Sequence, residues 1–530
     1  MIDFTRLVRN KLFFINVNKD ELVLFAFLAV YLISWTLLAA FLPLSTELDS
    51  IEQVVWSQIW QWGYYKHPPL PSALLHVLNS LFGGPSMGLT AFASQSCNVV
   101  ALIYVWLLAK QILSRKLAIT AVLISSLIAY YNFKALTFNH NSVSSPFTAA
   151  ALYYFYCTLR YPERTSTWLW LGLVSGLAML TKYSAVLILA SFFVYIVWQR
   201  LWTDIRVIRG LLISSVVFML VLSPHIVWLA DNNWLPFTYI HNKLSVSESR
   251  LEIFASFFIN QIIRLSFTLP LLLVVWYLSR KGAIKTAMVH SSESPKADHD
   301  LRFLLTVLLT PMILAMMPTL LTGSPLNNNW VSAFFLPVGI LVAKCFFQRL
   351  DETQLLKNAN WLAWVTHIAI LIVFFGGSVI YPAAVGRAAR SNFPSQALAE
   401  KVTEIWREHQ KEPLAIVISD TWTGGNVLLH ARPEPTLFIN NTTEFIDNST
   451  EKSPWVNAQD VAACGAFILT ITLDNVYPPL FSQILTKGKF SVAWGHGPRG
   501  KDLHYIWGIL PPLLNNATCR FNASNDSSVK

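Results

Sequence analysis

Charged residues are scarce in this chain of 530 residues. Asp, Glu, Lys and Arg make up 13% of it and hydrophobic residues 54%, whereas soluble domains carry about 25% charged residues. This composition excludes an ordinary soluble protein and indicates an integral membrane protein. The formal net charge of +10 is typical of basic loops gathered on one side of a multispanning chain, so we expect no nucleic-acid partner.

Several short motifs for cofactors and metals are also missing. The sequence contains no Walker A, HExxH or CxxC pattern, so nothing in it points to nucleoside-triphosphate or zinc-protease chemistry. Of the five cysteines, Cys97, Cys157 and Cys345 lie in or beside apolar stretches. Cys464 and Cys519 lie in the polar C-terminal part. If this part is external, its compartment is oxidising and a disulfide bond between them is one alternative; two free thiols are the other.

Apolar stretches that approach or reach the length needed to cross about 30 Å of hydrocarbon recur along the chain. We predict about eleven spans, at 22–43, 87–109, 117–133, 145–159, 167–180, 183–198, 210–229, 254–278, 303–322, 331–347 and 360–381. The basic residues Arg6, Arg9, Lys11 and Lys19 precede the first span and no small-residue cleavage site follows it, which indicates that it is not cleaved. If the N-terminus is cytoplasmic, strict alternation places every basic loop inside, as the positive-inside rule requires.

The same alternation leaves a second set of segments on the outer side. They are 44–86, 134–144, 181–182, 230–253, 323–330 and everything after about 385. These segments are poor in Lys and Arg but hold the unusual polar residues. We therefore expect any chemistry to face the periplasm or its equivalent.

From about residue 385 the composition becomes that of a soluble domain. The periodicity predicts a helix at 394–410 and strands at 414–419, 437–440, 465–472 and 503–510. The stretch TWTGGNV (421–427) is interpreted as a plain turn. The expected organisation is a transmembrane domain over 1–385 and a periplasmic α/β domain over 386–530.

The outer segment DSIEQVVWSQIWQWGYYKHPPLP (49–71) combines polar residues with rings that favour membrane interfaces. The rings are Trp56, Trp60, Trp62, Tyr64 and Tyr65. If this segment is helical, Asp49 and Glu52 share one face. A carboxylate there is a candidate general base for a hydroxyl acceptor, although Asp49 could equally cap the following helix.

Several cations are candidate ligands for a phosphate group. Lys66 and His67 precede the pair Pro68–Pro69, and the alternative for them is a snorkelling lysine and a solvated histidine. Lys182 and His225 lie near the outer ends of spans, where snorkelling is again the alternative. Arg264 lies inside an apolar span, where a charge costs about 2.5 to 3.5 kcal/mol, so it faces either a polar cavity or an ion-pair partner.

Four segments together resemble a known family in order and spacing. They are ELDSIEQVVWSQIWQWGYYKHPPLPSALLHVLNSLFG, FNHNSVSSPFTAAALYYFY, GLVSGLAMLTKYSA and LSPHIVWLADNNWLPF, and the resemblance covers about residues 20–385. They resemble bacterial glycosyltransferase family 39, which includes relatives of the protein O-mannosyltransferases and of the aminoarabinose transferase of lipid A. The resemblance implies an all-α polytopic GT-C fold with about 11 to 13 transmembrane helices, followed by the α/β domain.

The resemblance also implies roles for particular residues. Asp49 matches the catalytic aspartate of the first outer loop, but Ser50 stands where many members have a second acid, which leaves Glu52 nearby. Tyr64, Tyr65, Glu52, Asn139, His140 and Asn141 are expected to bind the sugar or the acceptor. Asn141 lies about where relatives have another aspartate; as an amide it could only form hydrogen bonds or orient Asp49. A divalent metal is left open, because the ligands seen in relatives do not all match.

The implied activity is transfer of a sugar from a polyprenyl-phosphate donor to an extracytoplasmic acceptor: lipid A or lipopolysaccharide core, another surface glycan, or a protein. Asp49 would serve as base, and Lys66, His67, Lys182, His225 and Arg264 would bind the donor phosphate. Two alternatives come from other classes. A lipid-linked sugar transporter or flippase should show inverted repeats and broken helices, and a non-catalytic assembly subunit would use the external domain to bind partners.

Overall fold

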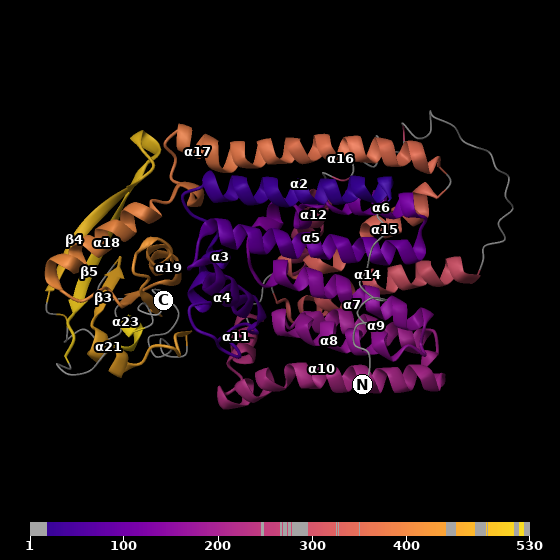
Figure 1. Ribbon diagram of the computed structural model, residues 1–530, viewed down its shortest axis with the longest axis horizontal. Helices are drawn as coiled ribbons and strands as arrows, with labels where there is room; N and C mark the ends of the chain where they lie inside the picture. Colours follow the sequence, from indigo (N-terminus) through magenta and orange to yellow (C-terminus); the bar gives the residue numbers. More distant parts are fainter. Residues whose placement is uncertain are drawn as a thin grey trace, which may run out of the picture.

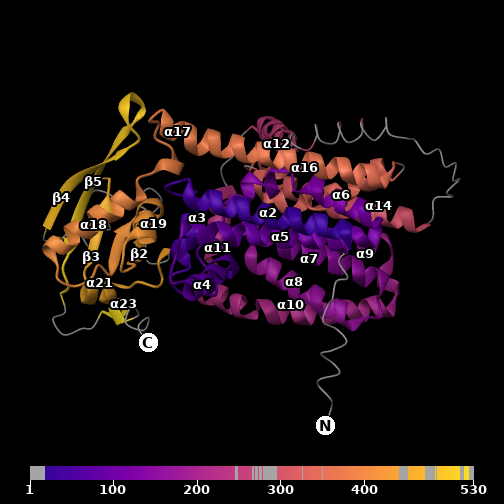
Figure 2. The ribbon, with the colours of Figure 1, turned by 45° about the horizontal axis from the view of Figure 1, so that its top comes forward.

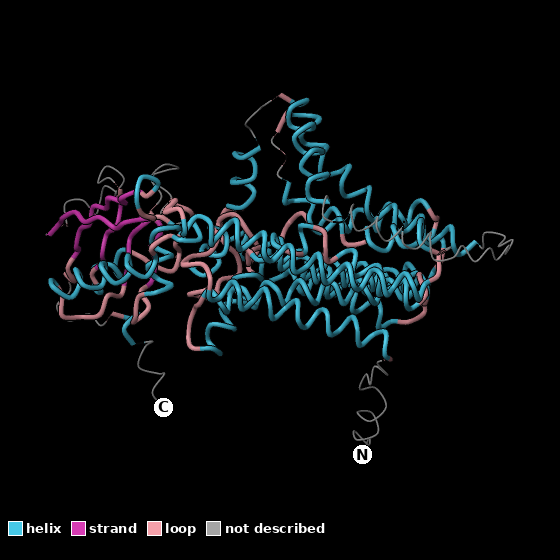
Figure 3. The backbone as a smooth tube through the Cα atoms, turned by 90° about the horizontal axis from the view of Figure 1, so that it is seen from above, coloured by secondary structure: helices cyan, strands magenta, loops and turns pink. Residues whose placement is uncertain are grey.

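The computed structural model describes residues 18–244, 249–265, 295–324, 326, 328–348, 350–440, 452–471, 484, 486–513 and 519–523, together with positions 268, 273 and 277. The helices of the first 384 residues lie side by side in a long bundle, and the C-terminal sheet lies at one end of it (Figures 1 and 3). The predicted fold class, a helical membrane protein with an α/β unit, is confirmed.

Five described helices are long and apolar enough to span a membrane, or seven if two bent pairs each count as one span. The five are α2 (Lys19–Phe41), α5 (Met87–Ile112), α10 (Ile205–Asp231), the part 298–322 of α14 (Pro295–Thr322), and α16 (Glu352–Phe375) continued by η6 (Gly376–Ile380) and α17 (Tyr381–Ala384). On α10 the side chains of Leu212, Val216 and Leu220 are each at least 60% exposed. Apolar surface of this kind indicates contact with lipid, and the chain is a multi-pass membrane protein.

The remaining helices fill the bundle or lie at its ends. They are α3 (Leu48–Trp56), α4 (Leu70–Phe82), α6 (Arg115–Ser125), α7 (His140–Arg160), α8 (Thr165–Thr181), α9 (Ala185–Trp198), α11 (Leu235–Leu244) and α12 (Arg250–Leu265). The predicted spans at 145–159, 167–180 and 183–198 correspond to α7, α8 and α9, and their crossing of the membrane stays a prediction. The span predicted at 254–278 lies partly outside the described residues.

Glycines allow α8 and α10 to approach closely. A Cβ atom on Gly172 would lie 2.5 Å from the Ser214 carbonyl oxygen, and one on Gly210 would lie 2.1 Å from the Trp168 ring. Both distances are shorter than any ordinary contact, so these two positions require glycine.

Two predicted spans are broken in the structure. The stretch 117–133 is helical only to the end of α6, after which η1 (Ala129–Tyr131) and η2 (Phe133–Leu136) turn by 87°. Serine and asparagine explain the break, because Ser126 Oγ donates to Leu123 O at 2.8 Å and Asn132 Nδ2 donates to Leu127 O at 2.9 Å. Such side chains compete with the helical hydrogen bonds. The stretch 331–347 bends by 44° between the 3₁₀ helix η4 (Asn328–Phe335) and the helical segment α15–η5 (Val338–Phe347).

The C-terminal unit contains one described sheet in the order β2-β1-β3-β5-β4. Its strands are β1 (Ile416–Ser419), β2 (Thr436–Ile439), β3 (Ala466–Thr470), β4 (Thr486–Trp494) and β5 (Lys501–Leu510). The first three are parallel, and β5 is antiparallel to both β3 and β4. Helices α18 (Ser395–His409), α19 (Thr421–His430), α21 (Ala458–Cys464) and α23 (Arg520–Ala523) complete the unit.

The four predicted strands and the helix at 394–410 are present. Strand β4 was not predicted, because all of its residues except Val492 are intermediate or exposed and they include two lysines and a glycine. The interpretation of 421–427 as a turn is wrong, since these residues begin α19, whose N-terminus is capped by Asp420. Cys464 and Cys519 form a disulfide bond, which resolves the two alternatives left open by the sequence.

Candidate active site

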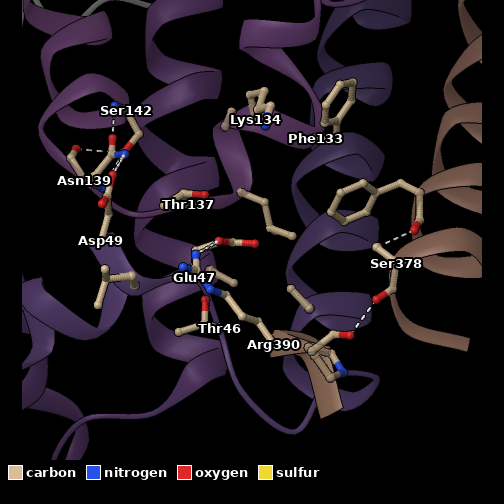
Figure 4. A pocket seen from close by; sticks show the side chains of 18 of the residues that line it. Thr46, Glu47, Asp49, Phe133, Lys134, Thr137, Asn139, Ser142, Ser378 and Arg390 are labelled. Carbon is tan, nitrogen blue, oxygen red and sulfur yellow. Dashed lines mark hydrogen bonds and ion pairs between the residues drawn. The ribbon is translucent and has the colours of Figure 1, made fainter. Parts of the chain in front are cut away.

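A cavity of about 410 Å³ lies where one end of the helix bundle meets the C-terminal unit. Its lining comes mainly from four separated stretches, 43–49, 133–145, 374–379 and 389–391. Figure 4 shows Asp49 and Asn139 on one side of this cavity, with Lys134, Glu47 and Arg390 also around it. Three of the predicted site residues line it: Asp49, Asn139 and Asn141.

Asp49 lies in the first turn of α3 and points into the cavity. Its Oδ2 atom accepts a hydrogen bond of 2.9 Å from Asn139 Nδ2. Asn139 is itself fixed, because its Oδ1 atom accepts from the backbone N–H groups of Asn141 and Ser142 as the N-cap of α7. The amide nitrogen of Asn139 must therefore face the carboxylate, and the remaining oxygen of Asp49 is left available to a ligand.

Asp49 does not cap its helix. The N-cap of α3 is Glu47, which makes no side-chain capping bond. The N-terminus of a helix favours acidic side chains, and the carboxylate oxygens of Asp49 can accept hydrogen bonds there.

Asn141 is tied to a lysine instead of to Asp49. Its Oδ1 atom accepts a short hydrogen bond from Lys182 Nζ, which comes from the turn between α8 and α9. Burial lowers the pKa of Lys182 to about 7, although the charge of Asp49 opposes this shift. The orienting role expected of Asn141 is thus carried by Asn139, and Asn141 brings a cation close to the carboxylate.

Ser50 stands where the resemblance leads us to expect a second acid, and its side chain joins two segments of the chain. Its Oγ atom accepts a hydrogen bond of 2.9 Å from the backbone N–H of Phe138, and the residue is fully buried. This bond fastens α3 to the segment that precedes α7. A glutamate could not occupy the same space without moving one of the two segments.

Lys66 and His67 lie outside the lining of the cavity. The ammonium group of Lys66 is 2.6 Å from Glu52 Oε1. Burial alone would lower the pKa of Lys66, but the adjacent Glu52 raises it above its usual value. The His67 ring lies 3.9 Å from the His140 ring, centre to centre, and burial, together with Lys66 and Lys182, holds the pKa of His140 well below its usual value.

The tyrosines and tryptophans of the outer segment divide into two groups. Tyr64 stacks on Trp56 and donates to its carbonyl oxygen at 2.9 Å, and both side chains are almost fully buried. Tyr65 contacts Tyr239 edge to face. Of these rings only those of Trp60 and Trp62 are more than 40% exposed. The outer segment is therefore packed against the rest of the protein and does not lie as a helix on the bilayer surface.

His225 of α10 and Arg264 of α12 contact the outer segment and the cavity wall, respectively. His225 Nδ1 donates to Trp62 O at 2.6 Å, so its Nε2 atom accepts from the Tyr183 hydroxyl at 3.0 Å. The first bond holds the outer segment against α10, and the second joins α10 to the turn between α8 and α9. Arg264 donates to Asn329 Oδ1 at 2.9 Å, and since Asn329 lines the cavity, Arg264 lies one contact behind the wall.

Two cations on the cavity wall were not singled out from the sequence. Lys134 has its ammonium group 5.8 Å from the centre of the Phe133 ring, and no acidic partner of it is present among the described residues. Arg390 pairs with Glu47 at 3.0 Å. The signal for Lys134 was available, because it is a basic residue in a segment assigned to the outer side, where basic residues are rare.

Metal binding receives no support from the described part of the chain. No group of three His, Cys, Asp or Glu side chains there could hold an ion. The arrangement is a carboxylate surrounded by amides and cations, and we assign no step of the chemistry to a metal.

The C-terminal unit forms part of the surroundings of this cavity. Asn426 of α19 accepts hydrogen bonds from Ser45 at 2.6 Å and from Ser395 at 2.8 Å, and Ser45 lines the cavity. On the same helix Gly425 packs directly against Ile51 of α3. The helix that carries Asp49 therefore rests on a helix of the other domain.

Comparisons with known proteins agree with this architecture. The sequence model of the family described as dolichyl-phosphate-mannose-protein mannosyltransferase matches residues 66–228. A curated relative from Rhizobium johnstonii, the lipopolysaccharide core galacturonosyltransferase RgtA, is 25% identical over 513 residues. The alignment covers 91% of this chain and 96% of the relative.

Solved structures of ArnT from Cupriavidus metallidurans share the fold. The structure with undecaprenyl phosphate has a TM-score of 0.60 at 13% identity and covers 93% of this chain and 98% of that one. The apo structure has a TM-score of 0.61 at 12% identity, with 92% and 97% covered. The fold is therefore like that of ArnT, and the sequence relatives, together with the membrane helices, indicate that the chain is a membrane glycosyltransferase.

Proposed function

We propose that this glycosyltransferase moves a sugar from a polyprenyl-phosphate donor to a hydroxyl group of an extracytoplasmic acceptor, with Asp49 as general base. The observation that carries the proposal is the Asp49–Asn139 pair at the cavity. One carboxylate oxygen is held by the amide at 2.9 Å while the side chain lines the cavity. A base must be fixed in this way to act on a bound hydroxyl.

The reaction follows from the charges around this carboxylate. Asp49 removes the proton of the acceptor hydroxyl as its oxygen bonds to the anomeric carbon of the sugar. The bond from that carbon to the phosphate oxygen breaks, and its electron pair leaves with the lipid phosphate. Attack opposite the leaving group inverts the anomeric configuration, through a transition state that resembles an oxocarbenium ion.

The leaving phosphate needs cations, and the cavity offers Lys134 on its wall. Lys182 and Arg264 lie behind the wall, one contact away through Asn141 and Asn329. Fixed positive charges stabilise the negative charge that develops on the leaving group. Lys66 is compensated by Glu52, so we assign it to the support of the outer segment.

The partners of the reaction are inferred from the relatives. An ArnT structure holds undecaprenyl phosphate, which supports a polyprenyl-phosphate donor for this chain. RgtA is named for its action on the lipopolysaccharide core, which supports a lipopolysaccharide or other surface glycan as acceptor.

We place the cavity and residues 386–530 in the periplasm and the N-terminus in the cytoplasm. The Cys464–Cys519 disulfide supports this, because disulfides persist in oxidising compartments. A reporter that is active only in the periplasm should work when fused after Lys530. Activity of a cytoplasm-specific reporter at that position would overturn the orientation.

Asp49→Asn tests the base. The variant should insert in the membrane and bind donor as the parent does, while kcat falls by about 10²- to 10⁴-fold, the usual contribution of a general base. Lys134→Ala should instead raise the KM for donor, because it removes a phosphate ligand and leaves the base. Undiminished transfer by Asp49→Asn would eliminate the proposed mechanism.

A further inference from the structure

Three cations surround a surface hollow between the last membrane helix and the sheet. Arg387 follows α17, Arg499 lies in the turn between β4 and β5, and Lys501 begins β5. Together with Tyr381 and Ala388 they line the hollow. All three cations are exposed, and in the described part of the chain none of them forms an ion pair with an acidic side chain.

The hollow is a fixed feature of the fold. Figures 1 and 2 show the β4–β5 hairpin reaching from the sheet to α17. The hairpin turn is bonded to the linker after α17, because Ala388 N donates to Arg499 O at 3.3 Å and His496 N donates to Gly386 O at 3.0 Å. A Cβ on Gly386 would lie 2.0 Å from His496 O, so the close contact between the linker and the hairpin requires glycine at this position.

The turn itself has the sequence GHGPRG (495–500), which matches the letters of a dinucleotide fingerprint. It joins two antiparallel strands, whereas the fingerprint requires a strand followed by a helix. The glycines therefore shape a hairpin turn, two of them with positive φ angles of 78° and 62°. The turn presents Arg499 at the hollow.

The position of the hollow decides which anion it meets. Tyr381 lies in the last turn of the candidate span that ends at Ala384, so the hollow lies at the depth of lipid headgroups. Asp502 is the nearest acid in sequence, but successive residues of a strand point to opposite faces, and it does not line the hollow. The local charge facing the membrane surface is therefore positive.

We propose that Arg387, Arg499 and Lys501 bind the phosphate group of a membrane lipid headgroup. Arginine suits phosphate because its guanidinium group donates two parallel hydrogen bonds, and basic clusters beside a span attract anionic lipids. The phosphate belongs either to a phospholipid of the bilayer or to a phosphorylated glycolipid acceptor. The next linker residues, 389–391, line the catalytic cavity, so the bound lipid lies beside the reaction.

Lipid retention by the purified full-length chain tests the site without reference to sugar transfer. Native mass spectrometry with short-chain phosphatidylglycerol and phosphatidylcholine should show that the chain retains the anionic lipid alone. Each basic residue at a membrane surface is worth about fivefold in affinity. The variant Arg499→Gln/Lys501→Gln should therefore bind phosphatidylglycerol about 25-fold more weakly.

The matched control is Lys487→Gln/Lys489→Gln, which removes the same charge from exposed positions of β4 in the same hairpin. Its affinity for phosphatidylglycerol should remain within about twofold of that of the parent protein. Equal losses in the two variants would mean that net charge alone attracts the lipid and would overturn the proposal. Unchanged binding by the Arg499/Lys501 variant, or equal retention of phosphatidylcholine, would overturn it as well.

A second comparison identifies the source of the phosphate. Lipid A and its dephosphorylated form are offered to the same proteins. Tighter retention of lipid A than of phosphatidylglycerol, lost on dephosphorylation, assigns the site to the acceptor, and the reverse order assigns it to bilayer phospholipid. Retention of neither phosphorylated lipid refutes the site and leaves the role of Asp49 untouched.

Discussion

Replacing one glycine of the C-terminal unit should slow sugar transfer at the other domain. A Cβ on Gly425 would lie 2.3 Å from Ile51 Cγ2 and 3.1 Å from Val55 Cγ2, so α19 and α3 must separate by about 1 Å. Ile51 is two residues from Asp49 in the same short helix, and the carboxylate must move with it. A misplacement of about 1 Å can cost about 10²-fold in rate, and the overpacking itself costs about 1 to 3 kcal/mol.

We therefore expect Gly425→Ala to lower kcat by about 10- to 100-fold, with a modest loss of thermal stability. Transfer is measured with saturating donor and acceptor, and unfolding by fluorescence on heating. Gly376→Ala is the control, because no atom lies within 4 Å of its added Cβ, and it should keep the parental rate.

A second substitution tests whether the contact between α19 and α3 causes the lower kcat. Ile51→Ala removes the methyl group that the new Cβ meets, so the double variant Gly425→Ala/Ile51→Ala should be faster than Gly425→Ala alone. Coupling of this kind is expected between residues in contact and absent between distant ones. A parental rate in Gly425→Ala, or a loss that Ile51→Ala does not relieve, would refute the reasoning.

Two further predictions concern pH. Burial lowers the pKa of the Lys182 ammonium group to about 7, so this group loses its charge as the pH rises through about 7. The KM for the anionic donor should increase over the same pH range. The variant Lys182→Arg should flatten this pH dependence in profiles of kcat/KM. Burial raises the pKa of Glu434 from 4.5 to about 7, so the stability it contributes is fully present below pH 4.5 and is lost as the pH rises through 7. Thermal unfolding of Glu434→Gln should match the parent near pH 4.5 and show a gain of up to about 3 kcal/mol at alkaline pH; equal stability of the two proteins at alkaline pH would contradict it.

Local patterns predicted much of this fold. Long apolar runs predicted the spans, and short apolar runs rich in strand-forming residues predicted four strands, because these signals depend on near neighbours in the sequence. The breaks after Ser125 and near Phe335 were missed, since an apolar run looks the same whether or not its polar side chains turn back on the backbone. The helix at 421–430 was missed because its paired glycines suggest a turn until the contact with Ile51 is known.

The site was predicted in part for the same reason. Asp49, Asn139 and Asn141 line one cavity, and their roles in it stay a prediction. The pairing of Lys66 with Glu52 could not be foreseen, because the two residues are fourteen apart and meet only through a reversal of the chain between α3 and α4. Arg390 escaped notice because its partner Glu47 lies more than 300 residues away.

The linker 386–391 has a consequence for how this enzyme can be re-engineered. One part of this linker lines the cavity through Arg390 and Ser391. The other part forms hydrogen bonds with the β4–β5 hairpin through Gly386 and Ala388. A chimera in which the C-terminal unit is exchanged between relatives at this linker would also change the shape of the cavity. Such a graft should preserve turnover only if the linker and α3 are transplanted together with the domain.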